Sequence, residues 1–421
     1  MMNTRFLICL LTVFSQLSAA YGQLTVEDCQ EKAKANYPQI KQFGLIQRSA
    51  EYNLSNAGKA WLPQVSLSAR ATYQSEATSI NIPAMHLNMG LPKDQYQAVV
   101  EASQLIWDGG VTKSQQQLVK ASAAVEKEKV EVELYTIKDR VNQLFFGLLL
   151  IDEQLKQQET LQHELKISYE RTVSAMENGV ANQSDVDAVK VEMLNNEQRR
   201  VELQASRKSF REMLSALTGQ SIQDSISLVK PLPDYHSVLT AEVKRPELHL
   251  FDSQLNLLEH QESLIRSGNY PKLGLFIQGG YGNPGLNMFK EGFSAYYIGG
   301  IRLSWNIGGF YTQKNNLNEL RNSRDRVTVQ RETFLFNNNL TMTKQDNEIE
   351  KAREQLRRDD EIIQLREHIK QASAVKVQQG TLTVPDLLRD IDAESLARNQ
   401  KSVHEIQLLM TISDFNYSTN Y

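Results

Sequence analysis

Four short motifs occur twice in this chain, in the same order and about 200 residues apart. Two of the pairs are separated by 208 residues, the third by 198 to 199 and the fourth by 201. A repeat of this length is a duplicated structural unit and is far longer than a solenoid repeat. We therefore expect two halves with the same order of elements. The pairs are Asn36–Ile40 with Lys244–Leu248, Trp61–Val65 with Asn269–Leu273, Trp107–Gly110 with Trp305–Gly309, and Gly179–Val186 with Gly380–Leu387.

Each half contains two segments in which apolar and polar residues alternate, and a period of two predicts strands with one apolar and one polar face. The alternation is strict over 64–74 and less regular in the other three segments, which are 96–107, 273–281 and 293–305. Connections rich in Pro, Gly and Asn, roughly 76–94 and 282–292, predict hairpin loops. The sequence therefore predicts β-hairpins at about 64–107 and 271–306.

After each hairpin comes a long segment without helix breakers. Residues 111–178 contain no proline and one glycine, and residues 310–379 contain neither. Apolar residues in both segments recur at steps of three and four, which is the pattern of a coiled-coil seam. Glycine ends each segment, and a capping sequence restarts a helix after it, which predicts helical hairpins at about 111–218 and 310–416. The seam residues are Leu134, Ile137, Val141, Leu144, Leu148, Ile151 and Leu155, and then Ile362, Leu365, Ile369 and Ala372.

The first 22 residues have the features of a secretory signal peptide. Arg5 precedes a short apolar run, and Ala20 and Gly22 are small residues before an expected cleavage at Gln23. An uncleaved anchor is the alternative. The rest divides into a first repeat over 23–220, a linker over 221–242 and a second repeat over 243–421. Cys29 is the only cysteine after the signal peptide, so we expect neither an intrachain disulfide nor a lipid anchor.

Composition excludes two classes of protein. The net charge is −4, so there is no basic excess to drive nucleic-acid binding. Mean hydropathy is −0.44, and no uninterrupted apolar run reaches the roughly 18 residues of a membrane-spanning helix. We therefore expect no binding to nucleic acid. Together with the periodicity described above, the sequence predicts a mainly α-helical chain with a small β part.

The predicted strands raise a closure problem, because four strands cannot form a barrel and small barrels need about eight. Aromatic residues lie at the four predicted junctions between helix and strand, and they include all three tryptophans of the chain. Amphipathic aromatics concentrate at membrane interfaces. We therefore interpret this set as a membrane girdle, with a soluble core plug as the alternative. The residues are Trp61, Trp107, Tyr270 and Trp305.

These motifs together resemble the TolC-like outer-membrane efflux proteins. The resemblance rests on the Leu-Pro-Gln-Val motif at 62–65, the Trp and Gly-Gly exits from the strands, and the repeated Gly-to-Asp segments at 179–185 and 380–386. The resemblance extends over residues of about 24–416. It implies a homotrimer with a 12-stranded β-barrel in the bacterial outer membrane, continued by an α-barrel tunnel in the periplasm. Residues 219–242 and the two chain ends would form a belt around it.

The resemblance also implies a periplasmic gate at the turns of the helical hairpins. Asp185 and Asp386 match the family's tip carboxylates, and a ring of three Asp386 side chains would select against anions. The alternative is that both residues only cap helices. Two positions depart from the family pattern, since its second tip aspartate is Arg389 here and its gating arginine is Leu382. The resemblance therefore does not support a second ring of tip carboxylates, nor the ion pair that the family's gating arginine forms with a neighbouring helix.

The same turns are the expected docking site for a periplasmic adaptor. Gly179 and Gly380 would form tight turns, and Val180 and Leu382 would offer apolar contacts. The implied function is passive export of substrates delivered by an inner-membrane pump of the RND or ABC type. The alternatives are a type I protein secretion channel of the same fold and a secreted structural coiled coil.

We find no sequence pattern for an enzyme or for a cofactor. Nucleophile elbows, phosphate-binding loops and zinc spacings are absent from the sequence. Met85, His86 and Met89 include soft-metal ligand types, but no further ligands cluster with them in the sequence. We therefore expect no catalysis, no cofactor and no resident metal.

Overall fold

The computed structural model describes residues 23–82, 87–224, 226–233 and 242–420. The predicted signal peptide, together with Met85 and His86, lies outside the described residues. By their contacts the residues form two compact units, which we describe separately. The sheet unit comprises the described residues within Gln42–Lys129 and His249–Glu332, and the tip unit comprises those within Met1–Lys41, Val130–Leu248 and Thr333–Tyr421. Each unit thus takes residues from both sequence repeats.

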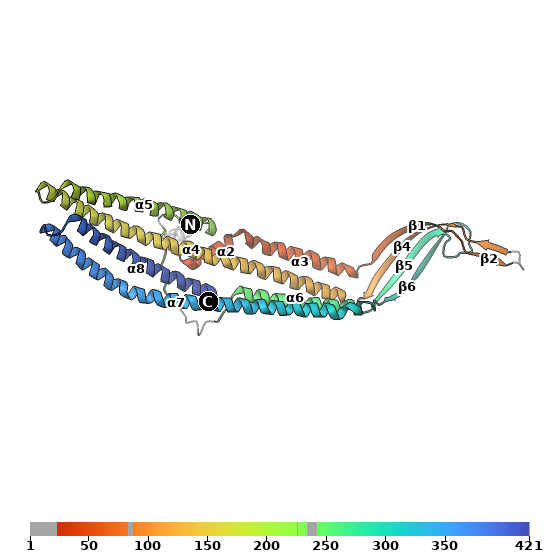
Figure 1. Ribbon diagram of the computed structural model, residues 1–421. Coiled ribbons are helices and arrows are strands. Elements are labelled where there is room, and N and C mark those ends of the chain that lie inside the picture. The colour runs from red at the N-terminus through yellow and green to blue at the C-terminus, as the bar shows by residue number, and fades with distance from the viewer. Residues whose placement is uncertain (1–22, 83–86, 225, 234–241, 421) are drawn as a thin grey trace, which may run out of the picture. The chain divides into compact units, whose positions relative to one another are not determined.

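The sheet unit contains a four-stranded antiparallel sheet with the order β1-β4-β5-β6 (Figure 1). Both predicted hairpins are present in it, which confirms the β part of the expected fold. The connection of the first hairpin differs from the prediction, because β2 (Ser79–Ile82) and β3 (Leu87–Gly90) pair there as a second, two-stranded ladder. The strands of the main sheet are β1 (Gln64–Tyr73), β4 (Asp94–Trp107), β5 (Lys272–Asn283) and β6 (Ser294–Ser304).

Strand register gives the main sheet one apolar and one polar face. Leu67 lies opposite Val100, Ala102 opposite Ile277, and Leu275 opposite Ile301, all on the apolar face. Residues displaced by one position along each strand belong to the other face, which is mainly polar. β4 is irregular near its end, where a bulge between Leu105 and Trp107 shifts the register.

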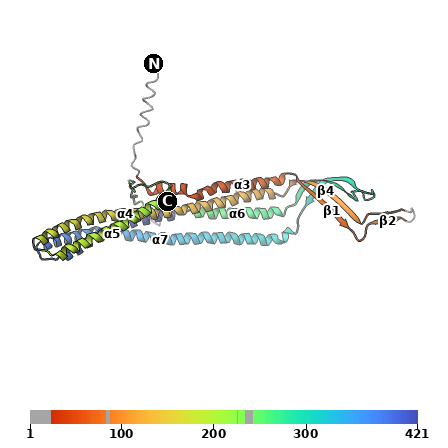
Figure 2. The ribbon, with the colours of Figure 1, turned by 90° about the horizontal axis from the view of Figure 1, so that it is seen from above.

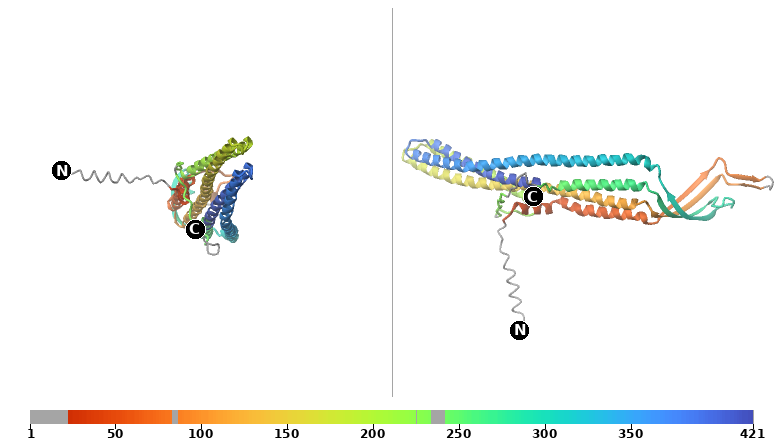
Figure 3. Two further views of the ribbon diagram at one scale, coloured as in Figure 1. Left: turned by 90° about the vertical axis from the view of Figure 1, so that its left-hand side faces the viewer. Right: turned by 90° about the horizontal axis from the view of Figure 1, so that it is seen from below.

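Helices accompany the sheet in the same unit. α3 (Gln42–Gly58) and the short η3 (Lys59–Trp61) lead into β1, and α6 (Pro246–Gly268) leads into β5. α3 runs beside the first part of α4 in all views (Figures 1, 2 and 3). An ion pair of 3.6 Å between Arg324 and Glu262 joins α7 to α6.

The tip unit is built from two antiparallel helical hairpins. α4 (Val111–Glu177) turns into α5 (Gln183–Thr218), and α7 (Gly309–Gln378) turns into α8 (Val384–Thr419); α4 and α7 begin in the sheet unit. The mainly helical fold with long hairpins is therefore confirmed. None of the described helices combines the length and the apolar character needed to cross a bilayer.

The two predicted coiled-coil seams differ in burial. Most of the first seam is buried, and Leu134, Val141 and Leu148 are at most 1% exposed. In the second seam Ile362, Leu365 and Ile369 are 45%, 55% and 45% exposed. On α5, Val191, Leu194 and Val201 form a similar exposed stripe. Figure 1 shows α5 and this part of α7 at opposite edges of the tip unit, so neither apolar stripe is covered by the described residues of the same protomer.

The chain ends and the central linker meet in the tip unit. α2 (Val26–Asn36) and η2 (Pro38–Lys41) follow Leu24, which forms an isolated parallel bridge with Leu228. Lys244 N donates to Thr419 O at 2.8 Å. Arg245 lies over the rings of Tyr135, Phe334 and Tyr417, at 5.0, 5.6 and 4.6 Å from their centroids. These cation–π contacts attach the start of the second repeat, just after the linker, to α4, α7 and α8.

Candidate functional site: the helix turns and the exposed sheet

Both helical hairpins of the tip unit turn at a glycine in the left-handed conformation. Gly179 has φ 75° and Gly380 has φ 72°, a region that residues with a Cβ rarely adopt. Val180 N donates to Ala175 O and Thr381 N donates to Lys376 O, both at 2.9 Å. These bonds are the six-residue closures of Schellman caps, so the two turns share one geometry.

The tip carboxylates Asp185 and Asp386 cap the second helix of each hairpin. Asp185 N donates to Asn182 Oδ1 and Asn182 N donates to Asp185 Oδ2, both at 3.1 Å, which is a reciprocal capping box. Asp386 N donates to Thr383 Oγ1 at 3.3 Å, and Thr383 Oγ1 donates to Asp386 Oδ2 at 2.5 Å. Both residues therefore have a structural role within the chain.

Arg389 lies one turn after Asp386 on α8, and its guanidinium forms an ion pair with the Asp386 carboxylate. The Asp386 side chain is 30% exposed and that of Arg389 is 76% exposed, so solvent screens the pair. One positive charge thus accompanies the Asp386 carboxylate in each protomer. A ring of Asp386 side chains would carry little net charge while this pair is formed.

The two turns pack against each other across the tip unit. A buried apolar cluster joins α4 and α5 to α8, and it is formed by Leu161, Leu165, Val189, Val384, Leu388 and Ile391. Beside the cluster lies a groove of about 850 Å³, whose walls come from both hairpins. Val180, Leu382 and Leu387 line it together with Thr172 and Ser168. The groove therefore combines the predicted docking residues of both repeats in one surface.

A buried charge network lies close to the same turns. Glu394 on α8 is 2% exposed and accepts from Arg398 Nε at 2.7 Å. Lys370 on α7 contacts Glu394 and also donates to Glu164 on α4 at 2.8 Å. Burial raises the pKa of the Glu394 carboxyl, but hydrogen bonds from Lys370 and Arg398 bring it below its usual value. The network therefore links three helices and keeps Glu394 ionised.

A second group of acidic side chains lies further along the tip unit. Burial, and then the nearby charge of Asp139, raise the pKa of Asp414 to about 7, while a hydrogen bond from Asn142 lowers it and Glu348 raises it. Asn142 is 1% exposed, and its Oδ1 accepts from Gln30 Nε2 at 2.6 Å. The group brings together α2, α4, α7 and α8, which no local sequence pattern indicated.

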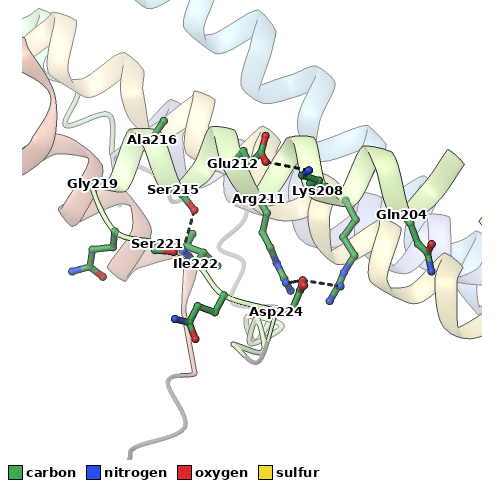
Figure 4. A pocket seen from close by; sticks show the side chains of 13 residues that line it. Gln204, Lys208, Arg211, Glu212, Ser215, Ala216, Gly219, Ser221, Ile222 and Asp224 are labelled. Carbon is green, nitrogen blue, oxygen red and sulfur yellow. Dashed lines mark hydrogen bonds and ion pairs between the residues drawn. The ribbon is translucent and has the colours of Figure 1, made fainter. Parts of the chain in front are cut away.

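A cavity lies where α5 ends and the linker begins (Figure 4). It measures about 930 Å³ and has Arg207, Arg211 and Asp224 in its wall. Arg211 forms an ion pair with Asp224, and Arg207 contacts the same carboxylate at 3.1 Å. Burial and the charge of Arg207 lower the pKa of Arg211. Because the arginines are paired within the chain, we assign this cavity to attachment of the linker.

The four junction aromatics occupy the ends of the sheet unit's strands, as expected. Trp61, Trp107, Tyr270 and Trp305 are all exposed. Trp305 Nε1 donates to Asn269 O at 2.9 Å, which fixes one ring at the junction while leaving its face accessible. These rings do not plug a core within the described residues of the protomer, and their place at a membrane interface stays a prediction.

A second aromatic group at the opposite end of the sheet was not predicted. Phe293 stacks on Tyr281 at 5.5 Å between ring centroids and lies 6.2 Å from Tyr96. Tyr96 and Tyr281 belong to the apolar face. The signal was present in the sequence as tyrosines near the strand ends, but only the register shows that they share one face and one level.

The described residues contain no group of three or more His, Cys, Asp and Glu side chains that could hold a metal ion. The arrangement also offers a sheet with faces of opposite polarity, of which the apolar one is exposed, and a groove beside the two helix turns. Both features are surfaces suited to binding.

Comparison with known proteins places these features in context. Residues 30–220 match the family model described as outer membrane efflux protein. No significant sequence match to a curated protein was found. The fold is similar to solved structures of VceC from Vibrio cholerae (TM-score 0.67, 14% identity, covering 94% of this chain and 95% of that one) and CmeC from Campylobacter jejuni (0.64, 15%, 94% and 85%). MtrE from Neisseria gonorrhoeae is also similar (0.64, 14%, 94% and 88%).

Proposed function

We propose that this chain is a TolC-like outer-membrane efflux protein and that it works as a homotrimeric exit channel that exports substrates passively. Each repeat contributes one β-hairpin to a shared 12-stranded barrel and one helical hairpin to a tunnel wall in the periplasm. The linker over 221–242 belongs to a belt on the outside of the helices. A periplasmic adaptor and an inner-membrane pump of the RND or ABC type deliver the substrate.

The observation that carries this proposal is the exposure of the apolar face of the sheet. On β1, Val65 and Leu67 are 70% and 76% exposed, although they lie on the apolar face. Exposed apolar surface of this extent needs a cover, and nothing in the protomer provides it among the described residues. A sheet with lipid on one face and water on the other satisfies both faces.

Closure of the sheet requires other copies of the chain. β1 and β6 each have a strand neighbour on one side only, and such open edges are not tolerated in a bilayer. Pairing of β6 in one protomer with β1 in the next removes every open edge when the ring closes. Three copies then supply about 12 strands, which exceeds the minimum of about eight for a barrel.

The apolar stripes of the tip unit support the same assembly. The α5 stripe and the α7 stripe are different surfaces at opposite edges of one unit. Contact between unlike surfaces is heterologous, and it produces a closed ring when the rotation permits. We infer that the α5 stripe of one protomer packs on the α7 stripe of its neighbour.

The two aromatic groups fit the thickness of an outer membrane. Tyr96 and Trp107 are the near-terminal aromatics of β4 and lie eleven residues apart. At about 3.3 Å per residue and a tilt of about 40°, they are separated by about 28 Å along the membrane normal. The apolar band of outer-membrane barrels is about 25 Å tall, so the two groups suit the two interfaces.

The tips suit docking of an adaptor. The groove beside Val180 and Leu382 offers apolar side chains next to rigid turns, a surface that favours packing of a partner's helical hairpin. The gate is assigned to the same region, with Asp185, Asp386 and Arg389 at the helix starts. No energy source is required of the channel itself.

Disulfide cross-linking between the edge strands tests the assembly. In a Cys29→Ala background, Ala69→Cys on β1 is combined with Gly299→Cys or Ile301→Cys on β6. Oxidation of the detergent-extracted protein is expected to give linked dimers and trimers and no larger species. The single-cysteine variants serve as matched controls and should give no trimer. A protein that is monomeric, and stays soluble without detergent, contradicts the proposal and supports a secreted coiled coil.

A further inference from the structure

The polar face of the main sheet carries nearly all the ionised side chains of its strands. Arg70, Glu101, Lys272 and Arg302 are the charged residues of that face. Asp94 is the one other charged residue of the four strands; it opens β4 opposite Tyr73 at the end of the apolar face. Three of the four charges on the polar face are positive.

Pairing within the sheet leaves two of these positive charges uncompensated. Arg302 Nη1 lies 2.9 Å from Glu101 Oε1, and the guanidinium stacks over Phe276 at 4.5 Å from the ring centroid. Arg70 has a neutral neighbour, because its Nη2 donates to Gln97 Oε1 at 3.4 Å. Within the described part of the chain, no carboxylate lies in ion-pair distance of Arg70 or Lys272.

The two uncompensated cations lie at different levels of the sheet. Lys272 begins β5, whereas Arg70 pairs with Gln97, which in turn pairs with Gly282 near the end of β5. Ten residues separate the two levels along β5, which is about 33 Å of extended strand. One cation therefore lies near each end of the polar face.

We propose that this face lines the exit segment of the channel as an anion-favouring wall and that the exported substrates are anionic or carry an anionic group. The inference rests on the proposed trimer, in which three protomers would place three copies of Arg70 at one level and three of Lys272 at the other. Charged rings at two levels favour ions of opposite sign along the path between them.

The tip residues are consistent with this selectivity. Asp386 is the carboxylate assigned to the gate, and its charge is accompanied by that of Arg389. The gate therefore presents little net negative charge to an anion. Because Arg302 is paired with Glu101, the excess positive charge on the polar face of the sheet comes from Arg70 and Lys272. These two residues are therefore the ones to substitute.

Reversal potentials in planar bilayers under a KCl gradient test the proposal. The wild-type trimer is expected to pass chloride in preference to potassium. The Arg70→Gln/Lys272→Gln variant should shift the chloride-to-potassium permeability ratio toward potassium by about threefold or more. The charge-conserving Arg70→Lys/Lys272→Arg variant is the matched control and should keep the wild-type ratio. Glu101→Gln should raise the preference for chloride.

Two kinds of failure are distinguishable in this experiment. A wild-type protein that forms no channels contradicts the proposed function. Channels that prefer potassium, or whose permeability ratio is the same in the wild type and the Arg70→Gln/Lys272→Gln variant, overturn the anion-favouring wall and leave the channel function in place. If the charge-conserving control also loses the preference, the effect belongs to side-chain shape and the charge argument is wrong.

Discussion

At the residue scale, each tip aspartate satisfies a local requirement. Asp185 closes a capping box with Asn182, and Asp386 bonds to Thr383 and pairs with Arg389. The Asp386–Arg389 pair spans three residues on one helix, so the helix period alone could have predicted it. A gating role for these residues stays a proposal, and it has to be separated from capping.

Removal of the Arg389 charge separates the two roles. Arg389→Gln leaves the Asp386 carboxylate without its cation, so a ring of three carboxylates should shift the chloride-to-potassium permeability ratio toward potassium by about twofold in planar bilayers. Adding Asp386→Asn to this variant should remove the increase. Asn182→Ala is the capping control: it removes the N-cap of α5 without changing a charge, and it is expected to cost about 1 kcal/mol of helix stability and to leave selectivity unchanged. A permeability ratio that is the same in Arg389→Gln and in the wild type rules out the ring.

The Asp414 carboxyl predicts a pH dependence of stability. Its pKa is raised to about 7 in the folded chain from an ordinary value of 3.8, so the folded state binds the proton more tightly than the unfolded state. The stability from this group is fully present at low pH and is lost as pH rises toward 7. Asp414→Asn should therefore raise the unfolding midpoint at pH 8 by roughly 2–5 °C. At pH 5 the difference from wild type should be smaller.

A matched variant checks the origin of that shift. Asp139 raises the pKa of Asp414 through its charge, so Asp139→Asn should also stabilise the protein at pH 8, by a smaller amount. Equal midpoints of wild type and Asp414→Asn at both pH values would show that the carboxyl is ionised without cost in the folded chain. Circular dichroism of the detergent-solubilised protein is the measurement.

At the element scale, the junctions between strand and helix are fixed by backbone geometry as much as by side chains. After Trp107, Asp108 Oδ1 accepts from Gly110 N at 2.8 Å and its Oδ2 accepts from Thr112 N at 2.6 Å, which caps α4. Although burial opposes it, these bonds hold the pKa of the Asp108 carboxyl below its usual value. Gly109 and Gly110 both have positive φ. The Trp-Asp-Gly-Gly motif is therefore a complete strand-to-helix turn.

The two glycines of this turn differ in their surroundings, and this gives a matched pair of substitutions. A Cβ on Gly109 would lie 2.5 Å from Tyr270 Cβ, whereas a Cβ on Gly110 has no neighbour within 4 Å. Gly110→Ala should cost about 1–2 kcal/mol through strain at positive φ. Gly109→Ala should cost roughly 1–3 kcal/mol more, because the clash adds to the strain. Denaturant titration of both variants is the test, and equal losses contradict the close approach of Tyr270.

Sequence periodicity predicted the elements better than it predicted their partners. The two long helical segments and both β-hairpins followed from steps of three and four, from alternation and from glycine stops. The connection over 76–94 was predicted as a loop and contains the β2–β3 ladder instead, because Pro, Gly and Asn mark turns without showing how far pairing extends beyond them. The same heptad pattern gave a buried seam on α4 and an exposed one on α7.

At the scale of the whole molecule, the exposed features share one cause. The apolar face of the sheet, its two open edges and the stripes on α5 and α7 are surfaces that one protomer leaves uncovered. A soluble monomer would bury them, since exposed apolar area is unfavourable in water by about 25 cal/mol per Å². Lipid and further copies of the chain are the covers that suit their chemistry. The edge-strand cross-links and the selectivity measurements test this conclusion at the scale to which it belongs.

The sequence by itself determined the duplication, the type and order of the elements, the glycine turns and the aromatic junctions. Each of these depends on periodicity or on backbone conformation within a few residues, and both are determined by residues that are close together in the sequence. Only the tertiary structure decided which charges lie together. The register of β1, β4, β5 and β6 puts Arg70, Glu101, Lys272 and Arg302 on one face, and helix packing brings Asp139 and Glu348 to Asp414. These contacts join residues far apart in the chain, and their energies depend on distance, burial and register that no local pattern encodes.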